Sequence, residues 1–217
     1  MPPDRPGLTW FAGWDVRGGT ARGEPREAAV PLAELGRKST LESYELLAVT
    51  ARGFRPPKFL TITEVPQDDT PWEHDATLGA RGPGGTELRQ TWSLLYQLIA
   101  ESNPRKSAPN AIYLLGVNPP PDATEDELEV FNDFYTNVHL REVAERRHAL
   151  RAARYELLRE LKAPFKGAPQ FLAVYELDEE GASQRKHVGP PYSPGPAVWQ
   201  GHRTPWRLWF RRIGDLE

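Results

Sequence analysis

The sequence contains an internal repeat, and this repeat limits the folds that the chain can adopt. The letters YELL occur at residues 44–47 and again at residues 155–158, an offset of 111. The segment PKFLTITEV, which begins at residue 57, matches PQFLAVYEL, which begins at residue 169, an offset of 112. A single repeat of this length is too long for a solenoid unit, and it indicates a duplicated domain.

Each half of the chain reads as strand, helix, strand, strand, helix and strand. Alternating runs rich in β-branched and aromatic residues predict the strands, and apolar residues at helical spacing predict the helices. The expected strands are 8–16, 41–50, 58–65, 111–117, 153–160, 170–177 and 206–213, and the expected helices are 25–35, 86–101 and 124–147. The fourth strand of the first half and the second helix of the second half have no clear pattern.

This order of elements is the split βαββαβ pattern of the ferredoxin-like sandwich. We therefore predict an α+β protein of two ferredoxin-like repeats, residues 1–108 and 109–217. The two repeats are expected to form one intramolecular barrel of the dimeric α+β type, because closure buries the apolar face of each sheet. No second copy is then needed to complete the barrel, although association into a homo-dimer stays open.

One predicted helix carries most of the polar chemistry. Thr124 and Glu127 fit a capping box at its start. Asn132, Tyr135 and His139 lie about one turn apart along it, so an amide, a phenol and an imidazole share a partly buried face. The apolar stripe that we expect to face the core consists of Leu128, Phe131, Tyr135 and Val138.

Composition excludes several classes of function. The 217 residues include no cysteine, which excludes disulfides, thiolate catalysis and cysteine-ligated metals. The net charge of -3 gives no general attraction to nucleic acid or to an anionic membrane. No segment has the length and hydropathy of a signal peptide or a membrane span, so a cytoplasmic protein without a membrane partner is expected. No two histidines have the i, i+4 spacing of a helical metal pair, and no metal site is predicted.

A basic run follows the polar helix, and we interpret it as a solvated, salt-bridged face. Its residues, which stand beside Glu142 and Glu145, are Arg141, Arg146, Arg147, Arg151 and Arg154. RNA-binding domains share the βαββαβ order, but their aromatic RNP1 signature is absent from every candidate strand, and nucleic acid is therefore not an expected partner.

Residues 111–213 resemble the EthD-like branch of the dimeric α+β barrel superfamily. The resemblance rests on an aromatic–Tyr pair with a histidine four residues later, which are Phe134, Tyr135 and His139. It also rests on an A-x-RY strand that ends at Tyr155 and on the segment PQFLAVYE. Two features depart from the family pattern. Phe134 stands where members usually have tryptophan, and residues 25–35 have neither the tyrosine nor the histidine, so at most one family-type site remains.

The resemblance implies a small apolar cavity between sheet and helix. Relatives include cofactor-free polyketide cyclases, dehydratases and decarboxylases, quinol-forming monooxygenases, and isomerases. The leading hypothesis is a cofactor-independent lyase, cyclase or dehydratase of secondary metabolism that acts on a small hydrophobic, aromatic or polyketide-like carbonyl compound. His139 would move a proton and Tyr135 would polarise or orient the substrate oxygen. The expected substrate-binding residues are Asn132, Phe131, Tyr113, Tyr175, His202 and Trp206.

Two other classes of function stay open. The missing tyrosine and histidine in the first half, together with Phe134, also fit a non-catalytic ligand-binding or structural barrel protein whose site has decayed. Duplicated α+β barrels also house haem enzymes, and in that case His139 or His202 would be the axial ligand. The substrate and the type of reaction are not decided by the sequence.

Overall fold

The structure, a computed structural model, describes residues 7–16, 41–49, 56–65, 80–81, 87–103, 107–162, 167–183 and 192–213. In this part of the chain, nine strands form one antiparallel sheet. They are β1 Leu8–Val16, β2 Leu41–Val49, β3 Phe59–Val65, β4 Ala80–Arg81, β5 Glu87–Glu101, β6 Ala111–Asn118, β7 Ala149–Lys162, β8 Phe171–Leu177 and β9 Arg203–Arg212.

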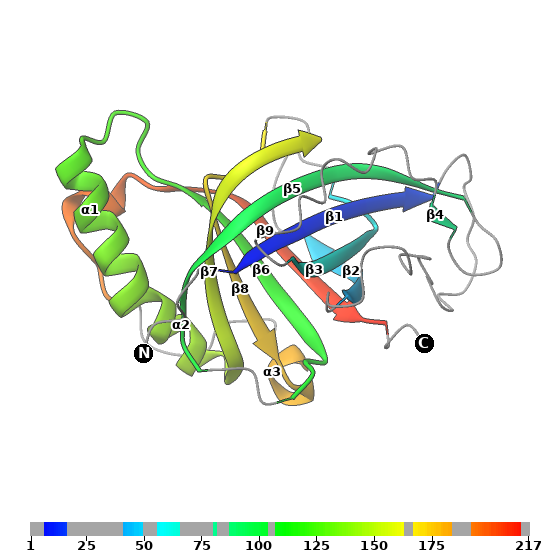
Figure 1. The fold of residues 1–217 in the computed structure, drawn as a ribbon. Coiled ribbons are helices and arrows are strands. Elements are labelled where there is room, and N and C mark those ends of the chain that lie inside the picture. Colours follow the sequence, from blue (N-terminus) through cyan, green and yellow to red (C-terminus); the bar gives the residue numbers. More distant parts are fainter. Residues whose placement is uncertain are drawn as a thin grey trace.

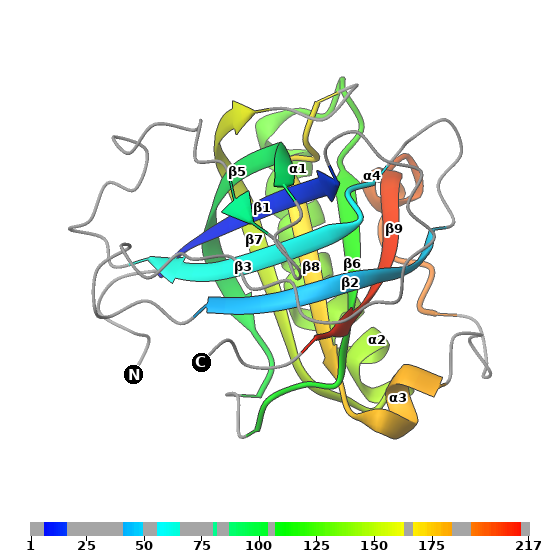
Figure 2. The same ribbon diagram turned by 90° about the vertical axis from the view of Figure 1, so that its right-hand side faces the viewer.

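The sheet closes on itself. The strand order is β1-β3-β2-β9-β6-β8-β7-β5-β4, and β1 also pairs with β5. Eight strands therefore form a closed antiparallel barrel, and the short β4 adds to β5 at the side (Figures 1 and 2). The predicted α+β barrel, closed within one chain, is confirmed.

The two halves of the chain contribute strands in the same spatial order. The first half supplies β2-β3-β1-β5, and the second half supplies β7-β8-β6-β9. The halves meet where β2 pairs with β9 and where β5 pairs with β7. Figure 2 shows β2 and β9 side by side at one of these seams.

Two glycines have matching surroundings in the two halves. A Cβ on Gly13 would lie 2.7 Å from the ring of Pro57, and a Cβ on Gly116 would lie 2.6 Å from the ring of Pro169. These distances are shorter than any normal carbon–carbon contact, so only glycine allows the proline ring to pack against the strand. Gly13 pairs with Trp92 and Gly116 with Trp206, and the two indoles stack on each other with ring centroids 4.6 Å apart.

The predicted helix at 86–101 is wrong, because this segment is the 15-residue strand β5. Its leucines favour a helix locally, but β5 pairs with β1 on one side and with β7 on the other. Trp92, Leu94 and Tyr96 point into the barrel at the strand period of two, whereas Ile99 is 39% exposed. Tertiary pairing overrides the local helix propensity here. β5 is therefore the fourth strand of the first half, for which the sequence has no clear pattern.

The polar helix lies on the outside of the barrel (Figure 1). It consists of α1 Glu125–Phe134, a π-helical turn at Tyr135–His139, and α2 Leu140–Arg146. The predicted capping box is confirmed: Glu127 N–H donates to Thr124 Oγ1, and Thr124 N–H donates to the Glu127 carboxylate. Two short helices, α3 Glu179–Ser183 and α4 Ala197–Gln200, follow β8 and precede β9.

The expected helix at 25–35 lies outside the described residues. In the described part of the chain, no helix is long and apolar enough to cross a bilayer.

The π-helical turn changes which residues of the polar helix face the barrel. Leu140 N–H donates to the carbonyl of Tyr135, five residues back, and the extra residue rotates the next turn. Phe131, Tyr135 and Leu140 are buried, but Val138, expected in the apolar stripe, is 37% exposed. The stripe therefore continues through Leu140 and Val143 instead of Val138.

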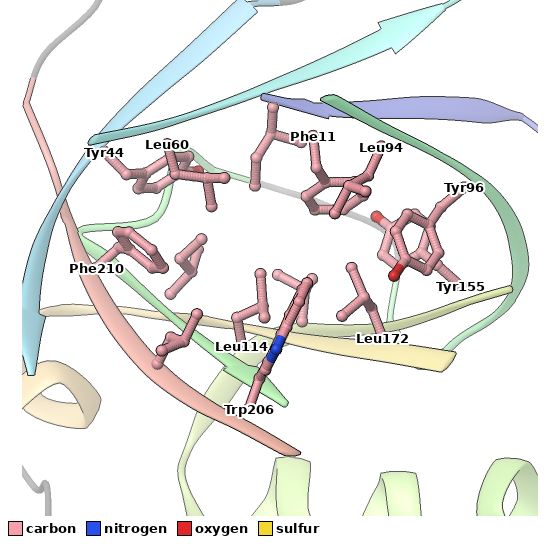
Figure 3. Packing of buried hydrophobic residues seen from close by; sticks show 14 of the residues in the cluster. Phe11, Tyr44, Leu60, Leu94, Tyr96, Leu114, Tyr155, Leu172, Trp206 and Phe210 are labelled. Carbon is pink, nitrogen blue, oxygen red and sulfur yellow. The ribbon is translucent and has the colours of Figure 1, made fainter. Parts of the chain in front are cut away.

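The barrel strands carry an apolar cluster on each of their two faces. Figure 3 shows the interior cluster, whose side chains converge from opposite walls of the barrel. The second cluster lies between the polar helix and the outer face of the barrel, and we call it the helix–barrel layer. Its buried members are Tyr113, Leu115, Val117, Phe131, Tyr135, Leu140, Val143, Ala144, Ala152, Phe171, Ala173, Tyr175, Leu177, Trp199 and Trp209.

Candidate functional site

The helix–barrel layer brings together most of the predicted site residues. Tyr135 and Phe131 enter it from the helix, and their rings meet edge to face with centroids 5.9 Å apart. Tyr113 of β6 and Tyr175 of β8 enter from the barrel, because alternate residues of these strands point outward. Trp199 of α4 packs against the same group, and its ring centroid lies 5.1 Å from that of Tyr135.

The hydroxyls of Tyr135 and Tyr175 are buried and have no hydrogen-bond partner. Both side chains are fully buried. Burial raises the pKa of each phenol above its ordinary value of 10, since the ionised form is not solvated in the layer. Both hydroxyls are therefore neutral at physiological pH, and each is able to donate a hydrogen bond.

His139 is half-buried at the edge of the layer and is surrounded by aromatic rings. The centroids of Trp199 and Tyr192 lie 4.7 and 5.3 Å from its imidazole. Its Nδ1 is buried without a hydrogen-bond partner. Burial lowers the pKa of His139 from 6.5 to about 4, against the opposing effect of the Glu142 carboxylate. The imidazole is therefore neutral at physiological pH.

Arg154 of β7 is the most deeply buried cation of the layer, with 1% of its surface exposed. Its guanidinium lies between the rings of Tyr135 and Phe171, at 4.4 and 4.3 Å from the ring centroids. It donates to Asn132 Oδ1 and to Thr136 Oγ1, at 2.5 and 2.9 Å. Burial lowers the pKa of Arg154 to about 10, and no described carboxylate forms a salt bridge with it.

Arg147, at the end of α2, is a second cation on the same layer. Its guanidinium lies 4.4 Å from the ring centroid of Tyr113 and 5.0 Å from that of Trp209. Its Nε is buried and has no hydrogen-bond partner, as is also true of the Nε of Arg154. Cation–π contacts hold both guanidiniums without neutralising them.

The prediction that the basic run is a solvated face is therefore wrong for three of its arginines. Arg151 and Arg154 are buried, and Arg147 is half-buried. Arg151 and Arg154 belong to β7, which is buried on both faces over residues 151–155. The predicted start of this strand at residue 153 left Arg151 in the preceding charged segment. A predicted strand that began at residue 149, as β7 does, would include both arginines.

Three expected binding residues lie elsewhere or have other partners. Trp206 points into the barrel interior and stacks on Trp92, so the structure does not bring it to Tyr135. His202 stacks on Trp199, with ring centroids 4.1 Å apart, and its Nδ1 lies beside the carbonyl oxygen of Trp199. The side-chain oxygen of Asn132 accepts a hydrogen bond from Arg154. Trp199 is a central residue of the layer that the sequence reasoning did not select.

The layer does not fit haem as its side chains are arranged. A neutral imidazole is a suitable axial ligand. However, the rings of Trp199, Tyr192, Tyr135 and Phe134 surround His139 with centroids 4.7 to 6.2 Å away, which leaves no space for a macrocycle at its face. His202 is likewise stacked on Trp199. Among the described residues, no group of three His, Asp or Glu side chains could hold a metal ion.

No family model matches the chain, and no curated protein matches it. Among solved structures, the chain is similar to the crystal structure of a "putative chlorite dismutase" at 10% sequence identity and a TM-score of 0.48. The match covers 95% of each chain. The barrel assignment above rests on the strand pairings of this chain, and no branch of the superfamily is assigned by the comparison.

The predicted cofactor-independent lyase, cyclase or dehydratase is corrected. None of the comparisons supports a lyase, cyclase or dehydratase: no family model and no curated protein matches, and the solved structure named above is described as a "putative chlorite dismutase". The pKa values also disagree with proton transfer by Tyr135 and His139. Burial raises the pKa of Tyr135 and lowers that of His139, so both move away from neutral pH, where a general acid or base works best.

Proposed function

We propose that the protein binds a small organic molecule in the helix–barrel layer. The observation that carries this proposal is a set of five buried polar atoms without hydrogen-bond partners in one continuous layer. They are the hydroxyls of Tyr135 and Tyr175, Nδ1 of His139, and Nε of Arg147 and Arg154. A buried polar group without a partner costs about 1–3 kcal/mol, so a concentration of such groups favours a site whose partner is a ligand.

The walls of the layer suit a flat ligand. Phe131, Tyr113 and Trp199 present aromatic rings on three sides. Pockets for small molecules are mostly apolar, with a few polar groups that fix orientation. In this proposal the aromatic rings hold the body of the ligand, and the unpartnered atoms hold its polar groups. Trp206 has no part in the site, because it lies inside the barrel.

The segment 192–202 is the proposed side of access. Tyr192 and His139, both half-buried, lie at this edge of the layer. Ser193 binds the Glu142 carboxylate through its backbone N–H and its hydroxyl, and this contact fastens the segment to α2. Apart from the buried Trp199, every residue of this segment is half-buried or exposed, so opening here is expected to cost less than opening the barrel.

We further propose that residues 1–108 and 109–217 are tandem ferredoxin-like repeats, as the sequence predicts. Support comes from the matched strand orders of the two halves and from the equivalent Gly13–Pro57 and Gly116–Pro169 contacts. The stacked Trp92 and Trp206 would then lie near the axis that relates the repeats. We also propose that the chain belongs to the EthD-like branch, on the residues that carry that resemblance. In this arrangement only the second repeat carries the tyrosine and histidine of the site.

The experiment is a binding titration with a flat neutral ketone, 2-acetylnaphthalene, measured by calorimetry. We expect Tyr135→Phe and Tyr175→Phe each to weaken binding about 2- to 10-fold, the effect of losing one hydrogen bond. Tyr96→Phe is the matched control, because Tyr96 lies in the barrel interior and its hydroxyl already donates to Pro169 O. This variant should bind the ketone with unchanged affinity.

Two outcomes would contradict the proposal. One is the absence of binding by any naphthalene derivative, charged or neutral. The other is binding that Tyr96→Phe weakens and Tyr135→Phe does not. Haemin serves as a further control ligand: a Soret band that disappears in His139→Ala would contradict the packing argument against haem at this position.

A further inference from the structure

The charges of the helix–barrel layer are unbalanced. Arg154 and Arg147 place two guanidiniums against the rings of the layer. Two carboxylates act on the charges of the layer. Glu142 lies on the side of His139 and is bound by Ser193, and the charge of Glu156 on β7 acts on Arg154 without a salt bridge. No described carboxylate forms a salt bridge with either arginine.

Arg151 and Arg154 are two buried arginines of the same strand, and only the first is neutralised. Arg151 Nε donates to Glu101 at 2.8 Å, and its Nη1 donates to Glu176 at 2.9 Å. Arg154 has an amide, a hydroxyl and a carbonyl as acceptors but no acid. A buried cation loses several kcal/mol of solvation, and neutral acceptors recover only part of this free energy. The charge of Arg154 is therefore only partly compensated: Glu156 acts on it without contact, and its hydrogen-bond acceptors are neutral.

The unpartnered atoms around Arg154 are mostly donors. The guanidinium Nε atoms of Arg154 and Arg147 donate only, and the hydroxyls of Tyr135 and Tyr175 are protonated. The chemical complement of such a set is an acceptor oxygen that carries negative charge. Hydrogen bonds between charged partners are about twice as strong as those between neutral groups.

We infer that the ligand of this site is an organic anion, a flat apolar body with a carboxylate or an ionised enol or phenol oxygen directed toward Arg154. This inference rests on the proposed function and adds the charge and orientation of the ligand. Glu142, which lies near His139, would repel the anionic group at that edge. The anionic oxygen therefore lies at the inner end, near Arg154 and Tyr135, and the apolar body extends toward His139 and Trp199.

The test compares two probes of nearly equal shape, 2-naphthoate and 2-naphthamide, by calorimetry at pH 7.5. We expect the carboxylate to bind about tenfold more tightly or better, because its hydrogen bonds to the guanidinium are charge-assisted. Arg154→Gln should reduce this ratio to about one, and Arg154→Lys should retain part of it. Arg151→Lys is the matched control on the same strand, and it should leave the ratio unchanged. Titration with 2-naphthol above and below the pKa of the probe then separates carboxylate from phenolate recognition.

The outcomes separate this inference from the proposed function. Equal affinity for naphthoate and naphthamide in the natural protein would overturn the anion inference, while ligand binding itself would stand. A preference for naphthoate that persists in Arg154→Gln would also overturn it. Failure of every naphthalene probe to bind would instead remove the proposed function. If Arg154→Gln does not fold, the ratio of the two affinities in the natural protein decides alone.

Discussion

The two faces of the barrel strands carry apolar clusters of similar size whose polar atoms are bonded very differently. In the interior, the Tyr96 hydroxyl donates to Pro169 O, and the Tyr44 hydroxyl donates to Glu42. In the helix–barrel layer, the hydroxyls of Tyr135 and Tyr175 have no partner. The tyrosines on both faces are equally buried, so burial does not distinguish the two clusters. The bonding of their hydroxyls does, and the proposed binding site rests on this difference.

Arg151 and Arg154 repeat this difference on a single strand. Arg151 is held by Glu101 and Glu176 at the end of the barrel, where it joins β7, β5 and β8. Arg154 faces the polar helix without an acid. A buried cation that pairs with acids recovers much of the solvation that it loses, whereas a buried cation without a salt bridge is costly unless something else binds to it.

The largest expected effect is on the interior cluster. Phe11 is 1% exposed and meets the rings of Tyr96 and Tyr155 edge to face, with centroids 5.5 and 5.4 Å away. Phe11→Ala leaves a cavity inside a closed barrel that cannot collapse, so it should cost about 3–5 kcal/mol of unfolding free energy. Urea unfolding measures this loss. Val130→Ala, at a position 49% exposed on α1, is the control and should change little. A cost below about 1 kcal/mol for Phe11→Ala would mean that the interior is not a rigid core.

The sequence predicts a barrel strand well where the local residue pattern and the tertiary pairing favour the same conformation. β6 and β8 are buried on both faces, and their unbroken apolar runs were recognised as strands. The helix with the capping box was also recognised, because its start is encoded by local side chains. β5 was missed because its leucines fit helical spacing, and only its pairing with β1 and β7, distant in sequence, decides its conformation.

The site was predicted only in part, for a physical reason. The tyrosine, histidine and aromatic residues of the layer lie in patterned segments, so their alternation indicates their common face. The roles proposed for Arg154 and Arg147 depend on their lacking a salt bridge with any described carboxylate, which is a property of the folded arrangement. No sequence pattern states which carboxylate an arginine will lack. The π-helical turn, which rotates Val138 outward, is likewise not indicated by the regular helical spacing from which the apolar stripe is predicted.

An intermediate effect is expected from pH, and it tests the helix–barrel layer alone. The pKa of His139 is about 4 in the folded protein and about 6.5 when unfolded. Below pH 6.5 the unfolded chain therefore binds a proton that the folded protein does not, and stability falls as pH decreases toward 4, by at most about 3 kcal/mol. Urea unfolding of the natural protein and His139→Gln between pH 7.5 and 4.5 isolates this contribution, because the variant lacks the titrating group. Parallel pH profiles for the two proteins would show that His139 is solvated.

The smallest expected effect is the most direct comparison of the two faces, since it removes one hydroxyl from each. Tyr96→Phe removes the bond to Pro169 O and leaves a buried carbonyl without a donor, which should cost about 1–2 kcal/mol. Tyr135→Phe removes a hydroxyl that has no partner, so the unfolding free energy without ligand should stay the same or rise by up to about 1 kcal/mol. Urea unfolding at pH 7.5 measures both. Equal losses would mean that the Tyr135 hydroxyl is satisfied in the protein without ligand, and the contrast between the two faces would then not hold.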